Sequence, residues 1–307
     1  MIQQQQHGDE RMRIATGILV WVTLTLAVTA SAQEAFGPQA APAAAHSFSV
    51  GTLKVTALRD AQFVAANDGK TFGVDAGPAA VSEVLRAAHA PTDRITLSVN
   101  VLLVPIGQRV LLLDSGLGPK LHGGLLASLR QAGVSPDAVT DILITHTHPD
   151  HVGGLLDANG ALAFPKATIR MANAEWAWLQ QQGSAELVKA ISAHVQAFEP
   201  GAELAPGVKS LAIKGHTPGH VGYEIVSGQA RLLDIGDLAH SSIVSLAKPS
   251  WTVAFDSDAA AAKSTRMTML SQLAKDHELV FAPHFPYPGV GHVVMAGDAF
   301  AWQAAAH

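Results

Sequence analysis

Short apolar runs, separated by polar and turn-forming residues, recur along the chain from about residue 48 onward and predict β-strands. Longer segments carry apolar residues at helical spacing, as Leu121, Leu125 and Leu129 illustrate. Strands and helices mix without strict alternation, which favours a layered α/β sandwich over a doubly wound sheet. The predicted strands are residues 53–58, 95–104, 109–113, 141–145, 167–171, 208–213, 221–226, 231–235 and 279–281, and the predicted helices are residues 121–131, 174–181, 185–197 and 258–274.

The N-terminal segment has the pattern of a secretory signal peptide. Arg11 and Arg13 precede an apolar run at residues 14–28, and the small residues at 30–32 provide a cleavage site. Because the apolar run is shorter than the ~20 residues that a membrane-spanning helix needs, cleavage is favoured over a stable membrane anchor. We therefore expect residues 1–32 to be removed and the mature chain to be periplasmic or secreted.

The segment after the cleavage site, residues 33–47, is rich in alanine and proline and has no apolar period, so it predicts a flexible leader. A single folded domain is expected at residues 48–307. The whole chain has 307 residues, of which 48% are hydrophobic, and this is ample for a large core.

The net charge and the absence of cysteine limit the binding partners and metal ligands that this chain can have. The formal net charge is -5 and Lys and Arg are not clustered, so the chain has no electrostatic footprint for nucleic acid or an anionic membrane. It has no cysteine, which excludes disulfides, thiolate zinc sites and cysteine nucleophiles. Any bound metal must be held by histidines and carboxylates.

The stretch THTHPDHVGG at residues 145–154 concentrates histidine and carboxylate side chains directly after a predicted strand. In an extended loop, residues two apart project to the same side, so His146 and His148 can face one ion. Pro149 suits the first turn of a helix, which would carry Asp150 and His151 to a second point nearby. The motif therefore indicates a platform for two metal ions.

Two adjacent ions need further ligands, and the downstream sequence offers them at the ends of other predicted strands. His216 lies in GHTPGH, Asp237 follows the strand at 231–235, and His284 follows the strand at 279–281. One edge of the fold can gather all of these side chains.

The motifs HTHPDH, GHTPGH, GD and PH, in this order, closely resemble those of the metallo-β-lactamase superfamily. The resemblance implies an αββα sandwich with the site at its edge and two bound divalent ions, expected to be zinc. It also implies the ligand set: His146, His148 and His216 for one metal, Asp150, His151 and His284 for the other, and Asp237 bridging both.

The remaining site predictions concern groups around these ligands. Asp150 or Asp237 is expected to accept a proton during the reaction, so that one carboxylate is both ligand and base. His220 either orients a ligand or satisfies a turn. An apolar substrate pocket is expected to include Trp178, Phe285, Tyr287 and His292. Trp176 is a further candidate for its wall, but Trp176 and Trp178, on different faces of the predicted helix at 174–181, are at least as well suited to packing in the core.

Two divalent ions that share a water lower its pKa toward neutrality, and no competing nucleophile motif is present, which favours a hydrolase. The segments PSWTVAFDSD and PHFPYPGVGH resemble most the methyl parathion hydrolase and quorum-quenching lactonase branch. The predicted function is a secreted di-zinc hydrolase of small neutral esters: lactones, aryl esters or organophosphate triesters. A β-lactamase and a non-catalytic zinc-binding protein are the alternatives, and a homodimer is left open.

Overall fold

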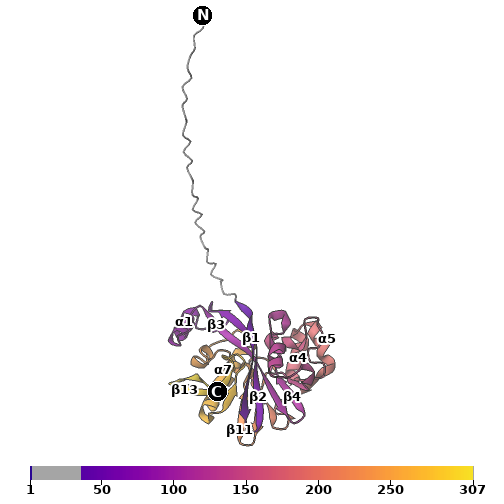
Figure 1. Cartoon of the computed structure of the whole chain (residues 1–307). Helices are drawn as coiled ribbons and strands as arrows, with labels where there is room; N and C mark the ends of the chain where they lie inside the picture. The colour runs from indigo at the N-terminus through magenta and orange to yellow at the C-terminus, as the bar shows by residue number, and fades with distance from the viewer. Residues whose placement is uncertain (2–35, 307) are drawn as a thin grey trace. The chain divides into compact units, whose positions relative to one another are not determined.

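Two sheets of seven strands each form the centre of the computed structural model, which describes Met1 and residues 36–306 (Figure 1). The first sheet has its strands in chain order: β1 (Gly37–Val50), β2 (Leu53–Ala66), β3 (Arg94–Ile106), β4 (Arg109–Leu113), β5 (Asp141–Leu143), β6 (Thr168–Ala172) and β7 (Val195–Phe198). The second sheet has the order β14 (Ala299–Ala304), β13 (Val290–Ala296), β12 (Leu279–Phe281), β11 (Ala230–Asp234), β10 (Val221–Ser227), β9 (Val208–Ala212) and β8 (Glu203–Ala205).

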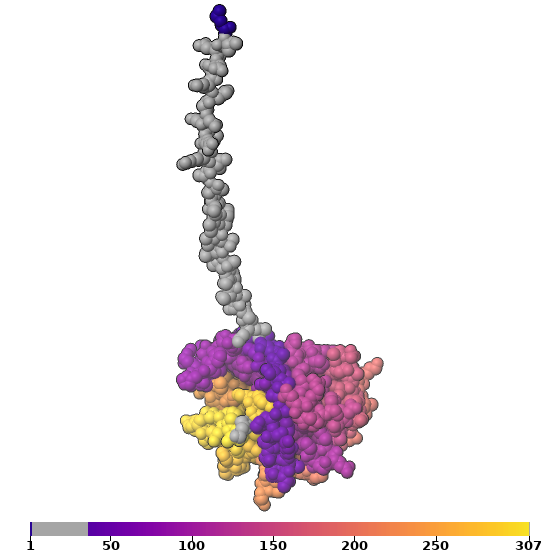
Figure 2. Space-filling model, viewed as in Figure 1, coloured from indigo at the N-terminus to yellow at the C-terminus, as the bar shows by residue number. Residues whose placement is uncertain are grey.

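Each sheet mixes antiparallel and parallel pairs. Strands β1 to β4 form an antiparallel meander, and β4 to β7 are parallel. In the second sheet only β11 and β12 are parallel. The long early strands form a band between the C-terminal strands and the segment with α4 (Asn173–Gln182) and α5 (Ala185–Ile191) (Figure 2).

The helices cover the outer faces of the two sheets. Leu129 of one helix and Leu179 of another pack with residues of β3 to β6, whereas Leu270 and Leu273 pack against β11 to β13. The fold is thus the αββα sandwich that the sequence predicted. The helices are α1 (Pro78–Ala87), α2 (Leu125–Gln131), α3 (Pro149–Val152), α4 (Asn173–Gln182), α5 (Ala185–Ile191), α6 (Val244–Ala247) and α7 (Ala259–Asp276).

The central core lies between the sheets. It joins side chains of the first sheet, such as Val104 and Leu113, to Val221, Ile225 and Phe281 of the second, all of them buried. Burying one such side chain contributes roughly 1.5–3 kcal/mol, which holds the two sheets face to face.

The prediction of a flexible leader is wrong for most of its length. Residues 37–50 form β1, which pairs with β2 from Gly37 opposite Val64 to Val50 opposite Leu53. The alanine-rich sequence has no alternation of its own, so the strand depends on pairing with β2. Its prolines are tolerated because β1 is an edge strand.

A second difference concerns the predicted helix at residues 185–197. Helix α5 ends at Ile191, and Val195–Phe198 form β7, which pairs in parallel with β6. Five further elements, β8, β13, β14, α1 and α6, were not predicted from the sequence. The predicted signal peptide falls, apart from Met1, outside the described residues. Among the helices that the structure describes, none is long and apolar enough to cross a membrane.

Candidate metal centre

The histidine-rich motif lies where the sequence predicted it, in the loop after β5. His148 is extended and precedes Pro149, the first residue of α3. Helix α3 then carries Asp150 and His151. The proline fits the first turn because its missing N–H has no helical partner there. The motif therefore presents side chains from an extended loop and from a helical turn.

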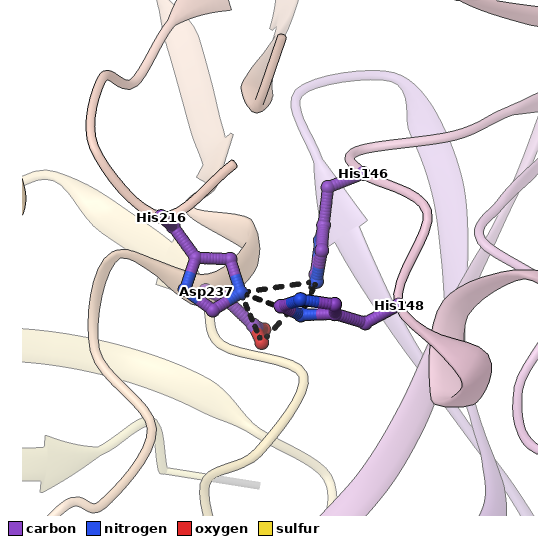
Figure 3. A group of neighbouring side chains, drawn as sticks. All are labelled: His146, His148, His216 and Asp237. Carbon is purple, nitrogen blue, oxygen red and sulfur yellow. Dashed lines mark hydrogen bonds and ion pairs between the residues drawn. The ribbon is translucent and has the colours of Figure 1, made fainter. Parts of the chain in front are cut away.

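The seven predicted ligands come together as two groups. Within each group, one possible ligand atom per residue lies within 4.8 Å of the others. His216 follows β9, Asp237 follows β11 and His284 follows β12, so strand ends of both sheets contribute. The first group is His146, His148, His216 and Asp237 (Figure 3), and the second is Asp150, His151 and His284.

Asp237 faces both groups with different oxygens. Its Oδ2 lies 3.5 Å from His146 Nε2 and 3.3 Å from His216 Nε2. Its Oδ1 lies 3.3 Å from His151 Nε2 and 3.1 Å from His284 Nε2. This is the position expected of a carboxylate that bridges two ions.

The contacts within the first group fit a metal ion better than hydrogen bonding. The nitrogens His146 Nε2, His148 Nδ1 and His216 Nε2 lie 3.0–3.2 Å from one another. Hydrogen bonds cannot explain all three contacts, because each neutral imidazole ring has only one donor nitrogen and one acceptor nitrogen. Asp237 Oδ1 is buried and has no hydrogen-bond partner among the described residues. Imidazole and carboxylate are also the ligands that suit zinc.

The second group favours positive charge. Burial alone would lower the pKa of His284, but the charges of Asp237 and Asp150 raise it to about 9. His151 behaves in the same way, and its pKa is raised well above the ordinary value. In the first group, burial lowers the pKa of His148 to about 4, so this imidazole is neutral at physiological pH and its nitrogen lone pair is free for a metal.

The second ring nitrogen of several ligands is held by the protein. His151 Nδ1 donates to Asp114 Oδ2 at 2.7 Å, and His284 Nδ1 donates to the carbonyl of Ser98 at 2.8 Å. His216 Nδ1 donates to Asp256 Oδ1 at 3.0 Å. Such partners determine which nitrogen faces the metal and how the ring is oriented.

Glu175 of α4 joins the two loops of the first group. Its Oε1 accepts hydrogen bonds from the backbone N–H and hydroxyl of Thr147, at 2.7 and 2.8 Å. Its Oε2 accepts from the hydroxyl of Thr217 at 2.7 Å and from the N–H of Gly219 at 3.0 Å. The side chain is fully buried. One carboxylate thus connects the loop of His146 and His148 to the loop of His216.

His220 lies in contact with the backbone of a ligand. Its Nε2 accepts a hydrogen bond from the N–H of Asp237 at 3.0 Å, and its Nδ1 donates to the carbonyl of Ile213. Burial lowers the pKa of His220 to about 3, which agrees with this neutral form. Gly236 has a positive φ of 46° beside it, and a Cβ there would lie 2.4 Å from His220 Nε2.

A cavity of about 280 Å³ opens onto both groups. His240 borders it with a 1% exposed ring, and His240 Nε2 lies 3.2 Å from Asp237 Oδ2. Apart from His240 and four of the ligands, the lining is apolar. The lining residues are Pro38, Phe63, Leu97, Leu117, Leu121, His148, Pro149, Asp150, Asp237, His240, Phe255 and His284.

The predicted pocket residues do not line this cavity. Phe285 is buried in the core against Trp302, and the hydroxyl of Tyr287 donates to the carbonyl of Ala57. His292 of β13 stacks on another histidine, His277. None of these three side chains borders the cavity.

Trp178 also lies outside this cavity. It meets the ring of His148 edge to face, with ring centroids 5.7 Å apart, and lines a neighbouring hollow of about 370 Å³. Its partner on the helix, Trp176, packs against the core of the first sheet, as the alternative interpretation had it.

Sequence reasoning missed the carboxylates Asp114, Glu175 and Asp256 as partners of the ligands. Asp114 directly follows β4, so a carboxylate at a strand end was the available signal. Glu175 lies within a helix, where the sequence carries no sign of its role. Such contacts depend on how helices dock on the sheet.

Comparison with known proteins agrees with this geometry. The model of the metallo-beta-lactamase superfamily matches residues 94–284. An N-acyl homoserine lactonase of Bacillus cereus is 30% identical over 96 residues, which are 31% of this chain and 36% of the lactonase. The match therefore spans about a third of that relative's length.

Two solved structures share most of the fold. AidC, a dizinc quorum-quenching lactonase, has a TM-score of 0.80 and 27% identity, covering 86% of this chain and 98% of its own. The hydrolase AbOPH of the beta lactamase superfamily has a TM-score of 0.79 and 29% identity with the same coverage. With the match over residues 94–284, two facing sheets and a two-metal ligand set at their edge, the chain belongs to the metallo-beta-lactamase superfamily.

Proposed function

We propose that this protein is a di-zinc hydrolase that opens the ring of small, neutral lactones with an apolar substituent. The observation that carries the proposal is the cavity, whose lining combines ligands of both groups, Asp237 among them, with the apolar side chains of Phe63, Leu97 and Leu117. The similarity to a dizinc lactonase supports both the metal and the substrate class.

The residues that would hold the ions are the two groups described above, with Asp237 shared. When bound, the ions supply Lewis acidity toward a carbonyl oxygen and lower the pKa of coordinated water. Asp237 and Asp150 are carboxylates at the floor of the cavity, and either is placed to take up the proton that such a water loses. His240 Nε2 lies 3.2 Å from Asp237 Oδ2 beside the cavity, so this ring would help to orient the bridging carboxylate.

The apolar side is suited to an acyl or aryl group. Leu121 is 39% exposed and Phe255 is 37% exposed, and both border the cavity. A substrate tail that covers them removes apolar surface from water, which contributes roughly 25 cal/mol per Å². N-acyl homoserine lactones combine a neutral ester ring with such a tail.

The test is kcat/KM of the zinc-loaded chain on N-hexanoyl homoserine lactone, a dimethyl aryl phosphotriester and a chromogenic cephalosporin, with a chelated sample as control. We expect chelator-sensitive turnover with the lactone ahead by about two orders of magnitude. A faster phosphotriester would make the chain an organophosphate hydrolase, and a faster cephalosporin a β-lactamase. Zinc binding without turnover of any of the three substrates would favour the alternative of a non-catalytic zinc-binding protein.

We also propose that the chain is exported and processed, because its N-terminal sequence has the pattern of a cleaved signal peptide. The test is N-terminal sequencing of the protein from the periplasm or medium of a bacterial host. A mature chain that begins at Gln33 is expected. An unprocessed chain in the cytoplasm would contradict the proposal.

A further inference from the structure

Strand β2 carries an irregularity beside the metal centre. Arg59 pairs with Asn100 and Ala61 pairs with Val99, so Asp60 is an extra residue without a partner on β3. The pairing with β1 also shifts here. Such bulges redirect a side chain and are common next to active sites. The side chain redirected here is a carboxylate, and it is 0% exposed.

The carboxylate of Asp60 binds both ends of one loop, residues 116–124. Its Oδ2 accepts a hydrogen bond from the N–H of Leu117 at 2.7 Å, and its Oδ1 accepts one from the N–H of Leu125 at 2.8 Å. Its own carbonyl accepts from the N–H of Gly124 at 2.9 Å. Three backbone donors of the loop therefore depend on one residue.

The loop approaches Asp60 so closely that glycine is required. A Cβ on Gly116 would lie 2.4 Å from Asp60 Cγ, and one on Gly123 would lie 2.8 Å from Asp60 Oδ1. Gly116 also has a positive φ of 73°, which side chains rarely adopt. The backbone of the loop thus lies in close contact with the carboxylate.

This arrangement is maintained at an energetic cost. Burial raises the pKa of Asp60 to about 6, although the three backbone N–H groups lower it, and the charge of Asp150 raises it further. A buried apolar side chain would avoid that cost. The carboxylate is useful where its two oxygens can each position a part of the loop.

The loop in turn forms part of the apolar side of the cavity. Leu117 is 4% exposed and Leu121 is 39% exposed, and both line the cavity. The loop also contacts the metal motif, because the N–H of Gly154 donates to the carbonyl of Gly116 at 3.0 Å. The loop therefore lies between Asp60 and the substrate space.

We propose that Asp60 is a positioning residue for substrate specificity: it holds the 116–124 loop so that Leu117 and Leu121 form a fixed wall for the apolar part of the substrate. The inference rests on the proposed lactonase function for the identity of the substrate. Asp60 itself touches neither the cavity nor the ligand groups. Its effect should therefore fall on binding of the apolar tail and not on the reacting ester.

The test is the Asp60→Asn variant, assayed above the pKa of Asp60 on butanoyl, hexanoyl, octanoyl and decanoyl homoserine lactones. One carboxylate oxygen is replaced by an amide NH2 group, so the N–H of Leu117 or of Leu125 loses its acceptor. We expect KM for the decanoyl substrate to rise about tenfold, while kcat stays within about twofold and the zinc content is unchanged. Leu121→Ala, which shortens the wall directly, should flatten the chain-length preference in the same way. Asp137→Asn, at an exposed site, is the matched control.

Two measurements report on the conformation of the loop and do not require catalytic turnover. Amide hydrogen exchange in residues 116–125 should become about tenfold faster in Asp60→Asn, with no change in residues 145–154. Binding of the dye 1-anilinonaphthalene-8-sulfonate should weaken in Asp60→Asn and Leu121→Ala alike. If the wild-type chain opens no lactone, the proposed function fails. Hydrogen exchange and dye binding then still test whether Asp60 holds the 116–124 loop in place.

Three results would overturn the inference. The first is an unchanged chain-length preference in Asp60→Asn, whether or not exchange in the loop increases. The second is a uniform loss of kcat together with zinc, which would assign Asp60 to the metal centre. The third, for a chain without lactonase activity, is unaltered exchange and dye binding.

Discussion

Asp237 is the residue through which the two ligand groups are connected, because each of its oxygens faces a different group. Asp237→Asn replaces one of these oxygens with an amide nitrogen, which cannot bridge. We expect the variant to bind fewer than two zinc ions per chain and to lose about three orders of magnitude in kcat/KM. Metal analysis and lactone kinetics check this, with Asp137→Asn as control. Two tightly bound ions and normal turnover would contradict the bridging role.

The raised pKa of Asp60 makes a separate prediction about stability. A carboxyl with a folded-state pKa of about 6 holds its proton in the folded chain where the unfolded chain, near 3.8, has lost it. Folding stability is therefore lost as the pH rises from about 4 to 7, by roughly 2–3 kcal/mol at most. The free energy of unfolding of the wild type minus that of Asp60→Asn should decline over this range. Urea titrations at several pH values measure it, and a flat difference would refute the assignment.

At the scale of elements, helix α4 acts on the metal centre through Glu175. Glu175→Gln keeps the shape but replaces one acceptor oxygen, so Thr147 or the Thr217–Gly219 turn loses its partner. We expect zinc affinity to fall about 10–100-fold, measured by competition with a chromogenic chelator. Glu186→Gln, on the exposed side of α5, should leave it unchanged. Equal affinities in the two variants would show that Glu175 has no positioning effect.

Helix α7 is joined to the site by a buried arginine. Arg266 binds Asp256 at 2.7 Å and the carbonyl of Leu238 at 2.8 Å, and its side chain is 2% exposed. Arg266→Leu leaves the carboxylate of Asp256 without its cation. We expect the free energy of unfolding to decrease by about 3–5 kcal/mol, measured in urea, whereas Lys275→Ala on the same helix should change it by less than about 0.5 kcal/mol. A loss below about 1 kcal/mol would contradict this role.

The elements differ in how far the sequence predicts them. Strands such as β4 and β12 are read correctly because their apolar runs are buried on both faces. Strand β1 was missed because its alanines and prolines form no such apolar run, and because the strand is held in place by pairing with β2.

The seven predicted ligands come together because each follows a strand that ends at the same edge. The cavity wall was misjudged because Phe285 packs in the core and Tyr287 binds the backbone of β2, and no local pattern predicts either contact.

For the molecule as a whole, metal removal should weaken the fold. The groups bring histidines and carboxylates from both sheets together, and a ligand that binds only the folded state stabilises it by ~4 kcal/mol at a thousand times its Kd. We expect the chelated chain to unfold at a temperature roughly 10 °C lower than the zinc-loaded chain, measured by calorimetry. Restoring zinc should restore the midpoint. A midpoint independent of zinc would show that the sandwich is stable without its metals.

The distribution of the ligands along the chain has a consequence for biosynthesis. Asp237 completes the first group, but the second group needs His284, which leaves the ribosome later than every other ligand. All ligands of the first group are therefore synthesised before the second group is complete. If the chain crosses the membrane unfolded, both ions are acquired where it folds, and the metals available in that compartment decide which ions the enzyme carries.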